Sequence, residues 1–189
     1  MRKKYIIIVI FCLIENILFS SSSGTTSVFN IGIGVKAQSL GGAYSAAEDD
    51  GVSVFFNPAS LNTVKKIEIN AAYIPLFYDA YYSYIVLCKP TIDYGCFGLS
   101  VAGITAENLI KRDNKGNITG NFSQLLTEVI FGWGKNFFFK TLNMGLNLKV
   151  FNIKIDEYND TSFGMDAGLL YDCLLYTSDA ADELDGVDF

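Results

Sequence analysis

The sequence predicts an all-β fold, a membrane-spanning antiparallel β-barrel that is preceded by a small segment without strands. Three observations predict it. Half of the residues are hydrophobic and 14% are aromatic, whereas only 18% are charged, against about 25% in a usual soluble domain. The amino terminus has the pattern of a secretory signal peptide, and no later stretch has the length and apolarity of a spanning helix. From residue 65 the chain alternates with period two, which is the pattern of strands.

Residues 1–23 are predicted to be the signal peptide. A basic start precedes an apolar run (5–14), and a group of small residues (20–24) follows. A retained spanning helix needs about 20 mostly apolar residues, and Glu15 interrupts this stretch. Cleavage before residue 24 would export the rest of the chain. An exported, apolar chain without spanning helices fits the bacterial outer membrane, where a closed barrel satisfies every backbone group in lipid.

Six segments carry the strand pattern. Large apolar side chains alternate in them with small or polar ones, as Leu146 and Leu148 do with Gly145 and Asn147. Each segment has about ten residues, the length that a tilted strand needs to cross a bilayer. Single-chain barrels have at least eight strands, so we expect this chain to be the N-terminal part of a longer barrel. The segments are 66–74, 79–88, 94–103, 126–134, 143–153 and 162–170.

The connections between these segments are expected to alternate in length. Three are short (74–78, 89–93 and 136–142), and two are longer and polar (105–123 and 154–161). Short turns on one side and long loops on the other are typical of barrels in the outer membrane.

The strand pattern also predicts which residues face the barrel lumen. The barrel interpretation places Asn147, Lys149 and Asp166 in the lumen, with a salt bridge between the last two, and turns the Leu, Val and Phe side chains toward lipid. A soluble β-sandwich, whose apolar faces pack on each other, would show the same alternation and is the alternative fold.

Composition excludes several functions. The net charge of −6 and the pI of about 4.6 are opposite to the basic surface that nucleic acid requires. The chain has no His, the commonest general base and a frequent metal ligand. We therefore predict no catalytic, metal or cofactor site and no enzymatic activity. Cys88 and Cys96 flank a turn, and the sequence leaves open whether they form a disulfide or remain two thiols packed on strands.

Residues 24–64, between the signal and the strands, are rich in small residues and lack alternation. Small residues let backbone segments pack closely, as a plug inside a narrow barrel would have to. The pair Asn57-Pro58 predicts a turn or the start of a helix. The acidic run 48–50 is expected to be a solvated or capping loop rather than a calcium site.

Three elements of this segment follow one another: a Gly-Gly-Ala-Tyr element (41–44), an Ala-rich stretch that ends in acidic residues (46–50), and an Asn-Pro-Ala element (57–61). A tyrosine-rich stretch (73–84) and residues 163–171 come after them. In this order they resemble the N-terminal signature of the PorV/PorQ-type outer-membrane proteins, which belong with the FadL-like fatty-acid transporters. The resemblance covers residues 30–172. It identifies a hatch motif that consists of Gly41, Gly42, Ala43, Asp49, Asp50, Asn57, Pro58 and Ala59.

The resemblance implies a barrel of about fourteen strands, with residues 24–64 folded into the lumen as a hatch and 65–172 forming the first six or so strands. It implies that the protein contacts outer-membrane lipid. It also implies a role in the transport of hydrophobic molecules or in type IX protein secretion, with a hydrophobic ligand or secreted cargo proteins as partners. The alternative is a secreted soluble β-sandwich that binds at the cell surface.

The last residues, 173–189, break the pattern of the chain. Alternation stops and acidic residues accumulate. The string resembles translated adapter sequence at the end of an assembled reading frame, and we expect it not to belong to the native protein. The other possibility is a genuine acidic tail.

Overall fold

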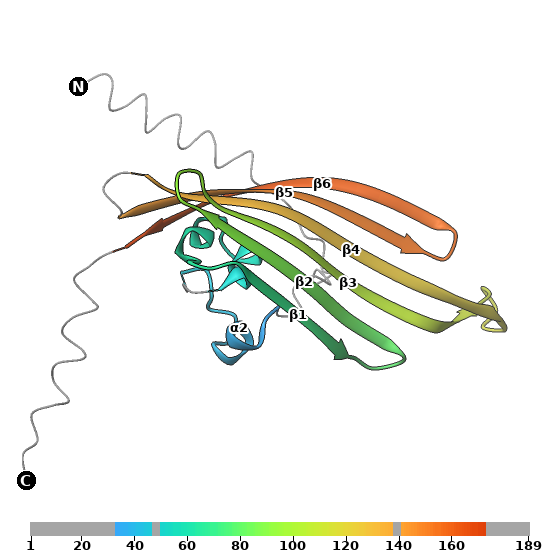
Figure 1. Ribbon diagram of the computed structural model, residues 1–189. Helices are drawn as coiled ribbons and strands as arrows, with labels where there is room; N and C mark the ends of the chain where they lie inside the picture. The colour runs from blue at the N-terminus through green and yellow to red at the C-terminus, as the bar shows by residue number, and fades with distance from the viewer. Residues whose placement is uncertain (1–32, 47–49, 138–140, 173–189) are drawn as a thin grey trace, which may run out of the picture. The chain divides into compact units, whose positions relative to one another are not determined.

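The computed structural model describes residues 33–46, 50–137 and 141–172, which belong to one compact unit. Their main element is a single antiparallel sheet in which each strand pairs with its neighbours in sequence (Figure 1). The predicted signal peptide, the acidic tail and Asp49 lie outside the described residues. The strands are β1 (Glu68–Pro75), β2 (Ala80–Thr91), β3 (Gly95–Arg112), β4 (Ile118–Phe137), β5 (Leu142–Ile155) and β6 (Tyr158–Tyr171).

The all-β prediction is confirmed, and each of the six predicted segments overlaps one of the six strands. The order β1 to β6 has no pairing between its first and last members, so the described strands form an open sheet rather than a closed barrel. No helix in the described part of the chain has the length and apolarity to cross a bilayer.

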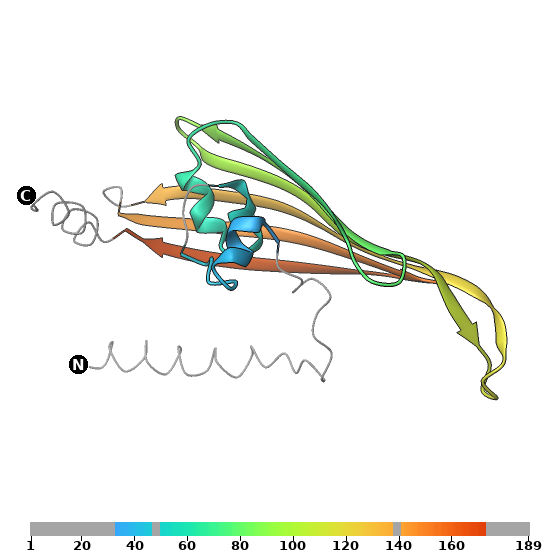
Figure 2. The same cartoon turned by 90° about the horizontal axis from the view of Figure 1, so that it is seen from below.

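The prediction of two long polar loops at 105–123 and 154–161 is wrong. Strands β3 and β4 continue through the first of these ranges and are joined by a turn at 113–117. Strands β5 and β6 are joined by a turn at 156–157. The resulting β3–β4 hairpin projects past the other strands (Figure 2). Most of its side chains are exposed to solvent, which suits polar residues, while its backbone groups pair across the hairpin. Polarity thus indicated solvent exposure and not the absence of a strand.

The two faces of the sheet differ in what lies against them. Two short 3₁₀ helices, η2 (Gly51–Phe55) and η3 (Pro58–Thr63), pack on one face, which we call the covered face; the opposite face is the bare face. A short helix, α2 (Val35–Ser39), precedes them. The core lies between the 3₁₀ helices and the covered face, where Val54, Leu61, Tyr82 and Ile130 are fully buried.

The bare face carries two complete rows of apolar side chains, because the register aligns one such residue from each strand. Most of them are exposed; Leu148 is 58% and Met165 71% accessible to solvent. A third row, next along the strands toward the β3–β4 hairpin, is mostly polar. The first row is Ile69, Leu87, Leu99, Phe131, Leu148 and Met165; the second is Ala71, Ile85, Val101, Val129, Val150 and Phe163; the third is Tyr73, Ser83, Gly103, Thr127, Asn152 and Thr161.

Candidate functional site

The Asn57-Pro58-Ala59 motif begins η3, as the Asn-Pro pair predicts. The Asn57 Oδ1 atom accepts the N–H of Ala59 at 3.0 Å, and Pro58 occupies the first helical position, where its missing N–H costs no hydrogen bond. The Asn57 side-chain amide also donates to the carbonyl oxygens of Ser45, at 2.9 Å, and Leu169 of β6, at 3.2 Å. One residue therefore caps the helix and ties it to the sheet.

Asp50 caps η2 in the same way. One of its carboxylate oxygens accepts the N–H of Val52 at 3.0 Å, and the other accepts the hydroxyl of buried Tyr44 at 2.8 Å. Gly41, Gly42 and Ala43 form an exposed turn, in which the two glycines have φ angles of 63° and 81°. Asp50 and Asn57 therefore cap the two 3₁₀ helices, and Pro58 and Ala59 lie in the first turn of η3. The Gly-Gly-Ala element forms a turn that precedes them in the chain.

Five glycines of the sheet form the surface on which this segment lies, and we call them the glycine floor. A Cβ atom at Gly145 would lie 2.3 Å from the carbonyl carbon of Pro58, and one at Gly168 would lie 2.0 Å from Asn57 Oδ1. Real Cβ atoms do not approach other atoms so closely. The segment therefore requires glycine at these positions. The floor consists of Gly98, Gly132, Gly134, Gly145 and Gly168.

Polar side chains of the covered face hold the segment through two backbone groups and one side chain. The buried Asn147 amide donates to the carbonyl oxygen of Val54 at 2.7 Å, and Glu68 accepts the N–H of Gly51 at 3.1 Å. At the other end, Asn62 donates to the Oδ1 atom of Asn143 at 2.8 Å. Because each bond satisfies a group that packing removes from water, the contacts fix the position of the segment on the sheet as well as stabilising it.

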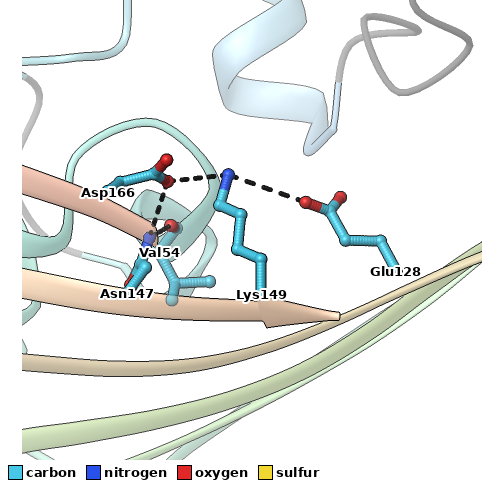
Figure 3. Close-up of polar contacts among 5 residues, drawn as sticks. All are labelled: Val54, Glu128, Asn147, Lys149 and Asp166. Carbon is cyan, nitrogen blue, oxygen red and sulfur yellow. Dashed lines mark hydrogen bonds and ion pairs between the residues drawn. The ribbon is translucent and has the colours of Figure 1, made fainter. Parts of the chain in front are cut away.

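Lys149 stands between two carboxylates, and we call these three residues the ion cluster (Figure 3). Its Nζ atom lies 2.7 Å from Asp166 Oδ2 and 3.6 Å from Glu128 Oε1. The Glu128 side chain is 5% exposed and that of Asp166 is 42% exposed, so Lys149 compensates one buried and one solvated charge. Asn147 joins the cluster to the N-terminal segment, since its amide also contacts Asp166 Oδ2 at 3.4 Å. Asn147, Lys149 and Asp166 therefore share one face, and the expected salt bridge is present.

These residues fix the N-terminal segment to the covered face of the sheet. Both carboxylates of the ion cluster share one ammonium group, Asn147 binds a backbone carbonyl of the segment, and Asn143 binds the side chain of Asn62. Within residues 33–46, 50–137 and 141–172, no group of three or more His, Cys, Asp or Glu side chains could hold a metal ion.

Cys88 and Cys96 are buried free thiols on the covered face. The register places Cys88 opposite Gly98 and Cys96 opposite Pro90, so the two cysteines are diagonal neighbours rather than a directly opposed pair. The Cys88 thiol lies 3.8 Å from the carbonyl oxygen of Gly51. Of the two possibilities that the sequence left open, the structure has the packed thiols.

Sequence reasoning missed the glycine floor, Glu128 and Asn143 as parts of this site. The alternation of Gly132 and Gly134 with Trp133 was a usable signal, because small residues on one face mark a close approach of another backbone. The sequence does not show which backbone approaches these glycines, because residues 54–62 are far from them in the chain.

Comparison of the chain with protein-family models, with curated proteins and with solved structures finds no match. The resemblance to the PorV/PorQ type therefore rests on the motifs of the chain itself.

Proposed function

We propose that the chain forms part of the wall and the N-terminal hatch of a bacterial outer-membrane β-barrel of the PorV/FadL type. The observation that carries this proposal is the bare face, where two rows of apolar side chains cross all six strands without interruption. Scattered exposed apolar residues are common on soluble proteins, but a contiguous apolar surface of this extent requires a partner. Lipid is that partner.

The dimensions of the bare face support a bilayer. On β6 the apolar outward positions run from Phe163 to Tyr171, which matches the roughly 9–11 residues of a tilted spanning strand. Aromatic side chains stand toward both ends of this band, as in the girdles of membrane barrels. At one end the indole N–H of Trp133 donates to the backbone carbonyl oxygen of Tyr94, and at the other the ring centroids of Tyr73 and Tyr81 lie 5.3 Å apart.

The covered face supports a lumen and a hatch. Beside the apolar core it bears the glycine floor, the buried asparagines and the ion cluster, and the N-terminal segment fills part of it. Further strands, paired to β1 and β6, would close the barrel around this segment. The proposal thus assigns Asn147, Lys149 and Asp166 to the lumen.

Two roles follow from the resemblance, namely transport of hydrophobic molecules and type IX protein secretion. The ion cluster favours secretion, because a hydrophobic molecule would need a continuous apolar path and charged groups interrupt the covered face. On this view the partners are secreted cargo proteins rather than a hydrophobic ligand. A strain that lacks the protein should retain cargo in the periplasm and keep its uptake of hydrophobic compounds; the opposite pair of results would assign transport.

The membrane assignment is tested by fractionating the full-length protein from its bacterial host. A barrel is recovered from outer membranes by detergent and migrates differently in gel electrophoresis before and after boiling. The alternative, a secreted soluble β-sandwich that binds at the cell surface, has a second sheet over the bare face. That protein would stay in the soluble fraction and show no change in mobility on boiling.

A further inference from the structure

Two hollows on the bare face adjoin each other at Thr105 and Leu125, which line both. The hollow nearer the apolar rows, which we call the lower hollow, has a volume of about 340 Å³ and is walled by Ile85 and Val101. The hollow nearer the β3–β4 hairpin, which we call the upper hollow, has a volume of about 760 Å³ and reaches Lys154 and the base of that hairpin. Together they lead from the apolar band into the polar hairpin.

The sequence explains why the sheet is hollow here. Ser83, Gly103 and Thr127 are in register on three adjacent strands, so three small side chains leave a furrow across the bare face. Farther along β3, the register shifts between Ala106 and Leu109, and Asn108 adopts a φ of 56°. A bulge of this kind bends its strand and opens space beside it.

The two linings differ in chemistry. The lower hollow combines branched aliphatic walls with the hydroxyl groups of Ser83 and Thr127. The upper hollow is lined by neutral groups that both donate and accept hydrogen bonds, from Asn108, Asn121 and Ser123. Such a lining matches a ligand with an apolar chain and a head group rich in hydroxyls.

Charge selects among amphiphiles. The upper hollow has one cation, Lys154, against two carboxylates, Glu107 and Asp156. Asp156 is paired with Lys111, and this pair leaves the rim without an excess of positive charge. An anionic phosphate head group, which needs several cationic or N–H donors, would be poorly held. An uncharged sugar would not be repelled.

We propose that these hollows form a binding site for a glycolipid of the surrounding bilayer. Its acyl chain lies in the furrow at Gly103, and its carbohydrate head group occupies the amide-lined hollow at the base of the hairpin. The site rests on the proposed function, since only a bare face that meets lipid presents the furrow to a bilayer.

The test uses the full-length protein in nanodiscs that contain phosphatidylethanolamine and a neutral monoglycosyl diacylglycerol in equal amounts, with bound lipid measured by native mass spectrometry. The Gly103→Leu variant fills the furrow, and the Asn121→Ala/Ser123→Ala variant removes head-group contacts while leaving the furrow intact. Ala167→Leu places a leucine of the same size elsewhere on the bare face and serves as the matched control.

The glycolipid should be retained by the wild-type and Ala167→Leu proteins. Either site variant should lose it about tenfold, as expected for two lost hydrogen bonds or a blocked furrow. Equal retention by all variants, or retention of phosphatidylethanolamine alone, overturns the site. Heat modifiability is read on every sample. A barrel that inserts but binds no glycolipid contradicts this inference alone, whereas a wild-type protein that does not insert contradicts the proposed function.

Discussion

The bare face and the covered face belong to the same strands, yet different interactions stabilise them. On the bare face, rows of Leu, Val, Ile and Phe side chains point away from the protein, and no helix or strand among the described residues covers them. On the covered face, glycines, asparagines and the ion cluster receive a segment of backbone at close range. Alternation alone sets the two faces apart. What each face requires depends on its partner: a bilayer tolerates many apolar side chains, whereas a backbone segment at this distance tolerates only glycine.

The largest expected effect concerns the charge at the centre of the covered face. Lys149→Met leaves the buried Glu128 carboxylate without its cation, and we expect a loss of about 3–5 kcal/mol in the free energy of unfolding. Asp166→Asn removes a solvated partner instead and should cost less than about 1 kcal/mol. Urea titration of the protein in lipid vesicles measures both. Equal losses for the two variants would show that burial of Glu128 does not matter.

The bare face is tested by a charge at its centre. Leu148→Arg lies in a complete apolar row and should destabilise the inserted protein by about 2–4 kcal/mol, the cost of arginine at the bilayer midplane. Thr127→Arg, in the polar row of the same face, should cost about 0–1 kcal/mol. The same vesicle titration serves, and a larger loss at Thr127 than at Leu148 would place the bilayer elsewhere.

The glycine floor predicts a smaller effect that is local to the N-terminal segment. A methyl group at Gly145 meets the backbone of Pro58, which cannot turn aside, so Gly145→Ala should cost about 1–3 kcal/mol and displace residues 50–64. Gly164→Ala is the control, because its methyl group meets the edge of the Phe151 ring at 3.2 Å and no backbone atom of the N-terminal segment. Hydrogen exchange of the amides in residues 50–64 should accelerate only in Gly145→Ala. Unchanged protection there would mean that the segment does not depend on the floor.

The smallest effect is expected at the hairpin tip, outside the bilayer. The backbone and side-chain amides of Asn117, with the N–H of Lys115, hold the pKa of the Asp113 carboxyl below its ordinary value. Because the pKa of Asp113 is lower in the folded state, its ionised carboxylate stabilises the turn at pH values above the ordinary pKa of the carboxyl. This stabilisation is lost as the pH falls through the folded-state pKa. Carboxyl NMR shifts should report it. The turn of Asp113→Asn should not respond to acid, and an ordinary Asp113 pKa would refute the assignment.

Much of the sheet could be predicted from the sequence because its alternation is regular. Leu146, Leu148 and Val150 marked one face, and Gly145, Asn147 and Lys149 marked the other. The capping role of Asn57-Pro58 also followed from local chemistry. The extended hairpins could not be predicted in this way. In residues 105–123 polar side chains lie on both faces, and the few apolar ones, such as Leu109 and Ile110, do not keep to one face. A period-two pattern then has no contrast to show.

The remaining parts of the site depend on contacts between residues distant in sequence. Glu128 became part of the ion cluster only through the register of β4 with β5, and the contact between Gly168 and Asn57 joins positions far apart in the chain. Such pairings are set by tertiary packing, which local patterns do not encode.

The most direct test of the account is quenching of the single tryptophan, Trp133, which lies on the bare face. The full-length protein is placed in bilayers with brominated acyl chains, and acrylamide is added separately from the aqueous side. The Trp133→Phe/Leu148→Trp variant moves the probe to the centre of the apolar rows. The account predicts strong quenching by brominated lipid at both positions, deepest bromines acting most at position 148, and weak quenching by acrylamide. Emission quenched by acrylamide but not by lipid, or shielded from both as in a sandwich, would contradict a bare face that meets the bilayer.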